Sequence, residues 1–317
     1  MKIFITGITG FSGSFLAENL VAKSSHEVSG TYLSENSLSN VSEVKDKLKL
    51  FKVDLQDAEA TKKIISEVKP DLVFHLAALT APAESFDNPS KFITNNISAQ
   101  VNLLEAIRST DITPRILIVS SAEVYGEISP GDLPINEDTP LRPVNPYAVS
   151  KVAQDFLGLQ YFLSYKLPIV RVRPFNHIGP RQSMSFVVAG FAKKIADIEK
   201  GIISPVLKVG NLSAKRDFTD VKDIVEAYVQ ILEKGEFGEV YNLGSGKSVQ
   251  IQEIVDKLLS FSTKEIKVEV DEKLLRPIDI PELVCDNTKI KHATGWEPKI
   301  DITQTLKETL EYWRNKN

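Results

Sequence analysis

Three glycines close to the amino terminus constrain the fold of this chain more than any other feature. They follow an apolar run, Lys2–Thr6, and lie in the segment GITGFSG as Gly7, Gly10 and Gly13; the next residues, Ser14–Lys23, read as a helix. A glycine-rich turn between a strand and a helix lets the backbone approach a pyrophosphate, which the helix N-terminus attracts. The alternative is a turn that only packs the helix on the strand. The strand–turn–helix context favours a dinucleotide-binding unit.

The rest of the first half alternates apolar runs with amphipathic stretches. Further strands are predicted at Glu27–Tyr32, Lys49–Val53, Leu72–His75, Ile116–Val119 and Ile169–Val172. Further helices are predicted at Ala58–Val68, Ser90–Arg108, Pro146–Leu163, Phe186–Glu199, Val221–Glu233, Ile251–Ser260 and Ile302–Arg314. Nearly continuous apolar strands between helices predict an α/β fold with a Rossmann-type, doubly wound parallel sheet.

The pattern changes after about Arg173, where glycine and proline become frequent and the apolar runs shorten. This change predicts a smaller α/β substrate-binding lobe. We therefore expect a dinucleotide-binding domain at residues 1–175 and a lobe formed mainly by residues 176–317. Part of 212–245 is expected to return to the first domain.

Charge and cysteine content exclude several classes of function. The net charge of −4 gives no basic field for nucleic acid or an anionic membrane, so neither is expected as a partner. The only cysteine, Cys285, has no partner for an intrachain disulfide, and the amino terminus lacks the apolar core of a signal peptide. We expect a cytoplasmic protein. No motif has the spacing of metal ligands, so no metal is expected.

The segment PYAVSK holds a candidate acid/base pair. Tyr147 and Lys151 are four positions apart on a predicted helix, which places them on one face. A phenol has a pKa of about 10, and a neighbouring ammonium favours its ionised form. The pair could also be two residues of an exposed helix face, because this spacing alone is common.

Taken together, these motifs resemble the extended short-chain dehydrogenase/reductase family, whose glycine turn has the same G-x-x-G-x-x-G spacing. The resemblance covers nearly the whole chain and implies an NAD(P) cofactor. It also implies these cofactor-binding residues: Gly7, Gly10, Phe11, Ser12, Gly13, Asp54, Leu55, Leu76, Ala77, Ala78, Asn96, Tyr147, Lys151 and His177. Ala99 and Gln100 depart from the family pattern after Asn96.

The choice between NAD and NADP stays open. The end of the second predicted strand, GTYLSEN, offers neither the acid that favours NAD nor the arginine that favours NADP. Ser34 could accept a phosphate there, and Glu35 could meet a ribose.

The resemblance also assigns catalytic roles around the fifth predicted strand. Ser121 holds the reacting oxygen, Tyr147 is the acid/base, and Lys151 lowers the pKa of that tyrosine. Glu123 stands where sugar 4,6-dehydratases have the base that acts at carbon 5, but related reductases also carry a glutamate there. A dehydration base and a substrate-positioning group therefore both remain open for Glu123.

In the second half of the chain, the resemblance implies a set of substrate-binding residues. Asn176, Arg216 and Arg276 match residues that contact the sugar diphosphate, and Lys193 could contribute. A guanidinium makes two charge-assisted bonds to phosphate, which suits this role. The alternative for Arg216 is a salt bridge with Asp217 or Asp220.

The residues of these motifs are most similar to those of GDP-4-dehydro-6-deoxy-D-mannose reductases, with GDP-mannose 4,6-dehydratases next. It implies reduction of the 4-keto group of a GDP-linked deoxysugar by NADPH or NADH. A 4,6-dehydratase or a 4-epimerase is the alternative, and a non-catalytic dinucleotide sensor is a third hypothesis. The resemblance further implies a homodimer formed through Ser90–Arg108 and the helix that begins near Pro146.

Overall fold

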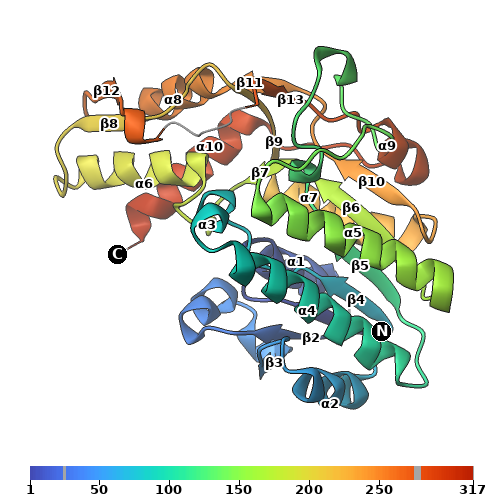
Figure 1. Ribbon diagram of the computed structural model, residues 1–317. Coiled ribbons are helices and arrows are strands. Elements are labelled where there is room, and N and C mark those ends of the chain that lie inside the picture. Colours follow the sequence, from blue (N-terminus) through green and yellow to red (C-terminus); the bar gives the residue numbers. More distant parts are fainter. Residues whose placement is uncertain (24–25, 275–279, 317) are drawn as a thin grey trace.

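The main body is a seven-stranded parallel sheet, as the computed structural model shows (Figure 1). The structure describes residues 1–23, 26–274 and 280–316. The strand order is β10-β6-β5-β4-β1-β2-β3. These strands are β1 (Lys2–Thr6), β2 (Glu27–Tyr32), β3 (Leu48–Lys52), β4 (Leu72–His75), β5 (Arg115–Val119), β6 (Ile169–Pro174) and β10 (Val240–Leu243). The predicted α/β fold with a doubly wound parallel sheet is confirmed.

Helices cover both faces of this sheet. One apolar core joins the sheet to α1 (Phe11–Lys23), α7 (Val221–Lys234) and α9 (Thr288–Thr294). A second core joins the other face to α2 (Ala58–Val68), α4 (Pro89–Arg108) and α5 (Pro146–Tyr165); in Figure 1, α4 and α5 lie in front of the strands. Burial of both faces explains the nearly continuous apolar sequence of strands such as RILIV.

A smaller lobe has a core of its own. Its four-stranded sheet consists of β7 (Asn176–Ile178), β9 (Lys215–Asp220), β11 (Ser248–Gln250) and β13 (Glu282–Leu283), while β8 (Val206–Val209) pairs with β12 (Lys267–Val270). The helices of this lobe are α6 (Val187–Glu199), α8 (Ile251–Ser260) and α10 (Ile302–Asn315). They gather at the top left of Figure 1, beside the carboxyl end of the chain.

Short connections bind the lobe to the main sheet. Only Phe175 separates β6 from β7, and α7 follows β9 without a loop. The lobe therefore begins directly at the carboxyl edge of the main sheet, where ligands of such sheets bind. The remaining short elements are α3 (Pro82–Asp87), η1 (Glu35–Val41), η2 (Lys45–Lys47), η3 (Ala122–Val124), η4 (Pro130–Asp132) and η5 (Glu272–Leu274).

Candidate active site

The turn between β1 and α1 is shaped for close approach of a ligand to the backbone. Gly7 has φ of +69°, in the left-handed region that glycine adopts without strain. A Cβ at Gly13 would lie 2.2 Å from the Gly7 carbonyl oxygen, so a larger residue cannot stand there. The Gly10 amide donates to the same carbonyl at 2.9 Å, and α1 begins at Phe11. The N-terminus of α1 is thus open to the turn, which fits the pyrophosphate of a dinucleotide.

The loop after β4 is fixed beside this turn. Thr6 is fully buried, and its hydroxyl oxygen accepts the amides of Leu76 and Ala77 at 3.1 and 3.0 Å. The same oxygen lies 2.9 Å from His75 Nδ1. A Cβ on Gly7 would come within 3.2 Å of Ala77 Cα, so the two loops are in contact. Ala78 follows, partly exposed.

Two of the predicted cofactor-binding residues make hydrogen bonds within the protein. The Asn96 side chain accepts the Leu79 amide at 2.8 Å and donates to Ser150 Oγ at 2.9 Å, so it braces the loop after β4 against α5. Leu55 is buried in the core, and its carbonyl accepts from Asn102 at 2.9 Å. Neither side chain offers a free polar group to a ligand. Asp54, by contrast, is exposed, and its carboxylate accepts the Gln56 amide at 2.9 Å.

The structure brings Ser121 and Tyr147 together. Ser121 follows β5 and caps η3, where its hydroxyl accepts the Glu123 amide at 3.2 Å. Tyr147 lies in the first turn of α5, and Lys151 is one turn further on. The Tyr147 phenol and the Ser121 hydroxyl are hydrogen-bonded, and Ser121, Tyr147 and Lys151 are all buried.

The electrostatics of the tyrosine differ from the prediction. Burial raises the pKa of Tyr147 above its ordinary value, and the hydrogen bond to Ser121 only partly opposes this. The expected lowering by Lys151 is not observed. The Lys151 ammonium donates to the Val119 carbonyl at 2.7 Å and to Gln154 Oε1 at 2.9 Å. Burial lowers the pKa of Lys151 itself to about 7. A raised pKa keeps the Tyr147 phenol in its protonated form at neutral pH.

Glu123 lies at the same site and is held by a residue that the sequence analysis missed. Its Oε2 accepts from Asn145 Nδ2 at 3.1 Å, and its charge contributes to the raised pKa of Tyr147. The Asn145 Oδ1 accepts the Ala148 amide at 2.7 Å and so caps α5. One buried asparagine therefore fixes both the start of the catalytic helix and the glutamate. An asparagine directly before Pro146 was a visible capping signal.

A histidine joins the glycine turn to the smaller lobe. His177 Nε2 lies 2.9 Å from Ser12 Oγ, and its ring stacks on Phe11 with 5.6 Å between centroids. Its Nδ1 faces the Phe175 carbonyl at 3.2 Å, which makes Nδ1 the donor and Nε2 the acceptor of the Ser12 hydroxyl. Arg181, also missed, pairs with Glu18 on α1 at 2.7 Å.

The predicted substrate residues are only partly assembled by the structure. Asn176 is half-buried on β7, and β7 pairs with β9, which carries Arg216. Arg216 Nη1 donates to the Ile280 carbonyl at 2.7 Å. Lys193 is paired with Asp197 on its own helix, at 2.5 Å, which does not support a ligand role. Arg276 lies outside the described residues.

Asp217 and Asp220, the alternative salt-bridge partners predicted for Arg216, bond to other groups. Asp217 is fully buried and accepts the amides of Ser245 and Gly246 at 2.8 and 2.9 Å. Asp220 caps α7 through the Lys222 amide and accepts from Thr305 Oγ1 at 2.7 Å. Both carboxylates thus organise the lobe.

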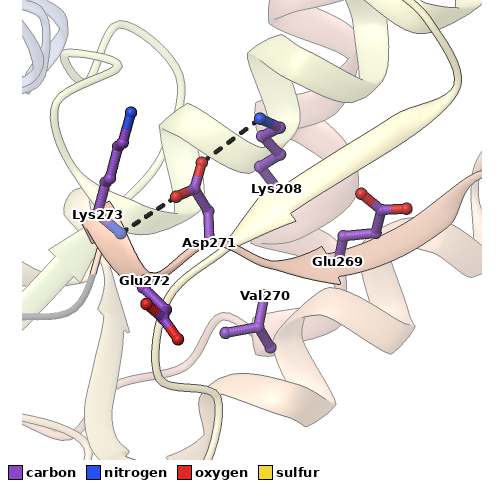
Figure 2. Close-up of a pocket in the computed structure, with 6 residues that line it drawn as sticks. All are labelled: Lys208, Glu269, Val270, Asp271, Glu272 and Lys273. Atoms are coloured by element: carbon purple, nitrogen blue, oxygen red, sulfur yellow. Dashed lines mark hydrogen bonds and ion pairs between the residues drawn. The ribbon is translucent and has the colours of Figure 1, made fainter.

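A depression on the smaller lobe does not belong to this site. Figure 2 shows its lining residues, which come from β8, β12 and the segment after β12, none of which carries a predicted catalytic residue. Its volume is about 400 Å³. Lys208 and Asp271 pair across it at 3.5 Å, so its charges largely satisfy one another. In the part of the chain that the structure describes, no group of acidic, histidine or cysteine side chains could hold a metal ion. None of the described helices combines the length and the apolar character needed to span a membrane.

Comparison with known proteins identifies the family. The model of the family described as GDP-mannose 4,6 dehydratase matches residues 4–309. The chain belongs to this family. It is 33% identical to the GDP-6-deoxy-D-mannose reductase of Pseudomonas aeruginosa, over 99% of this chain and 98% of that protein. It is 31% identical to GDP-mannose 4,6 dehydratase 2 of Arabidopsis thaliana, over 97% of this chain and 85% of that protein.

The solved structures of relatives agree with this assignment. The structure of RMD from Pseudomonas aeruginosa complexed with NADPH has a TM-score of 0.85 and 32% identity, and covers 99% of this chain and 98% of that one. The predicted membership of the extended short-chain dehydrogenase/reductases is confirmed, and with it an NAD(P)-dependent enzyme of nucleotide-sugar metabolism.

Proposed function

We propose that this protein reduces the 4-keto group of GDP-4-dehydro-6-deoxy-D-mannose with NADPH or NADH. The observation that carries the proposal is the hydrogen bond between the buried phenol of Tyr147 and the Ser121 hydroxyl, at the carboxyl edge of the same sheet as the glycine turn. A proton donor is what reduction of a ketone requires. The likeness to the Pseudomonas aeruginosa reductase and to its NADPH complex supports the same reaction.

In this reaction, the predicted site residues have separate roles. A bound NAD(P)H supplies the hydride for the carbonyl carbon. Tyr147 donates its phenolic proton to the carbonyl oxygen as negative charge develops there, and the Ser121 hydroxyl holds that oxygen in place. A positioned general acid of this kind accounts for about 10²–10⁴ in rate. Asn176 and Arg216, with Arg276, bind the diphosphate of the sugar nucleotide.

One observation favours a second candidate, a 4,6-dehydratase. The Glu123 carboxylate is partly exposed and is aimed at the catalytic pair by Asn145, where it could remove a proton from the sugar. The family model and the Arabidopsis relative support this alternative.

A direct assay separates the two. With GDP-4-dehydro-6-deoxy-D-mannose, the reductase consumes NAD(P)H, which is followed by the loss of reduced-nicotinamide absorbance. Tyr147→Phe removes the proton donor and is expected to lower turnover by at least about 10²-fold with folding intact. Conversion of GDP-mannose without added reductant would overturn the reductase and favour the dehydratase.

We further propose that the protein is a cytoplasmic homodimer. The exposed face of α5 carries Val149, Phe156 and Leu163, which are 43%, 50% and 56% exposed. They are spaced by seven residues and so form one apolar stripe along the helix. Because α4 packs alongside α5 (Figure 1), two such faces can meet as a four-helix contact.

A further inference from the structure

Gln154 lies within hydrogen-bonding distance of the catalytic lysine and is fully buried on α5. Its Oε1 accepts from Lys151 Nζ at 2.9 Å. Its Nε2 donates to the Asn96 carbonyl at 2.9 Å and approaches His75 Nε2 at 3.4 Å. A buried amide is costly unless its polar atoms are bonded, and here both ends of the amide are.

These partners leave the amide only one orientation. An ammonium can only donate and a backbone carbonyl can only accept, so Oε1 must face Lys151 and Nε2 must face Asn96. The backbone of Gln154 is fixed by α5 itself, and its carbonyl also accepts from Gln100 Nε2 at 2.7 Å. The oxygen that meets the ammonium is therefore held from α4 and from within α5.

The lysine has few other groups to support its charge. Its second acceptor is the Val119 carbonyl, which is also neutral. Asp155 favours the ammonium through its charge, but its carboxylate is bonded to Arg171 at 2.5 Å and to Arg173 at 2.8 Å. The titratable or charged side chains around the site come from β4, β6, η3 and α5 and are His75, Arg171, Arg173, Glu123, Tyr147 and Asp155.

We propose that Gln154 is a positioning residue that holds the Lys151 ammonium in place, one turn of α5 after Tyr147, and favours its charged form. The residue acts through the lysine and need not touch the substrate. The inference deepens the proposed function, since it concerns the same site, but it rests on contacts that do not depend on which sugar is bound.

Gln154 affects the lysine through the equilibrium between the charged and neutral forms of Lys151. Burial lowers the pKa of Lys151 to about 7, so the charged form is only partly populated at neutral pH. A hydrogen bond accepted from the charged form favours that form. His75 adds no competing charge, because burial lowers its pKa to about 3 and leaves it neutral.

Three variants test this role. Gln154→Met keeps the length of the side chain but removes the acceptor, and Gln154→Glu keeps the shape and adds a negative charge. The matched control is Gln100→Met, which removes another fully buried glutamine on α4 that bonds only the backbone of Gln154. Folding of each variant is checked by thermal unfolding.

The readout is the titration of Lys151, followed by NMR with isotope-labelled lysine and assigned with Lys151→Arg. We expect Gln154→Met to lower the pKa of Lys151 by about one unit and Gln154→Glu to raise it by about 1–3 units. Gln100→Met should destabilise the fold without moving that titration. At pH 7 a fall of one pKa unit takes the charged fraction of Lys151 from about one half to about one tenth, so Gln154→Met should lower kcat about fivefold in the reductase assay.

The two proposals fail in different ways. An unchanged Lys151 titration in both Gln154 variants would overturn the positioning role, whatever the substrate. A titration that shifts as expected in a protein that does not reduce the GDP-sugar would leave the positioning role intact and remove only the proposed function.

Discussion

At the scale of single residues, two asparagines that each precede a proline behave differently. Asn145 has extended backbone, with ψ of 158°, and its side chain accepts the Ala148 amide at 2.7 Å. Asn88 has ψ of 55° and makes no side-chain cap bond, although α4 begins at Pro89, one residue before the predicted start. The same sequence signal thus yields a cap only where the backbone turns the side chain toward the helix.

Asn145 is expected to support activity and stability through separate atoms. Asn145→Ser keeps a capping oxygen but loses the amide that holds Glu123, so stability should change by less than about 0.5 kcal/mol. Turnover should fall about tenfold, since a hydrogen bond to a charged group is lost. Asn145→Ala removes both functions and should cost about 1 kcal/mol in the free energy of unfolding as well. Chemical denaturation and steady-state kinetics measure the two effects; equal turnover in wild type and Asn145→Ser would show that Glu123 does not depend on this bond.

The sequence could predict the site residues whose chemistry is local, and only those. Tyr147 and Lys151 are four positions apart, and Ser121 follows an apolar strand in a recognisable motif. Gln154 and His75 are 79 positions apart and are joined only by the fold. The predicted lowering of the Tyr147 pKa is not seen, because burial raises that pKa and spacing along a helix carries no information about burial.

At the scale of elements, α5 contributes both to the candidate active site and to the proposed dimer contact. Its inward face carries Tyr147, Lys151, Gln154 and Asp155, all buried, while its outward face carries the apolar stripe. Six of the seven strands of the main sheet were predicted closely, and most residues of five of them, all but β3, are buried; β10 was not among the predicted strands. Strands such as β11, three residues of mixed character, could not be predicted, since their pairing partners define them.

The junction of α5 with β6 should be the most sensitive ion-pair site of the fold. Asp155 is fully buried between Arg171 and Arg173. Asp155→Asn would leave two buried guanidinium groups without a counter-charge, which should cost about 3–5 kcal/mol in the free energy of unfolding.

The control for this prediction is an exposed pair. Lys49 and Glu67 contact at 2.7 Å with half or more of the lysine side chain in solvent, so Glu67→Gln should cost less than about 1 kcal/mol. Urea denaturation of both variants gives the comparison. Similar losses in the two would mean that the buried cluster contributes no more than a surface pair.

At the scale of the whole molecule, the chain passes between its two parts more than once. It leaves the main sheet after β6, returns through α7 and β10, and leaves again for β11 and α8. The glycine turn, the catalytic helix and the start of the smaller lobe therefore share the carboxyl edge of one sheet. His177, bonded to Ser12, connects the lobe directly to the turn.

This arrangement leaves the outer face of α5 free to pair with a second copy. In a twofold dimer the same stripe meets itself, so one substitution places two new charges close together. Phe156→Arg should therefore convert the protein to a monomer at micromolar concentration, because two arginines would face each other in an apolar contact. Light scattering measures the mass of each species in solution.

Ile202→Arg is the matched control, because Ile202 is a 66% exposed apolar residue of the smaller lobe, outside the stripe. It should leave the dimer unchanged. Both variants should fold with native stability, since neither side chain belongs to a core. A dimer that survives Phe156→Arg would move the interface to another face of the molecule, and a wild-type monomer would remove the dimer altogether, while the active site, which is built within one chain, would stand unchanged in either case.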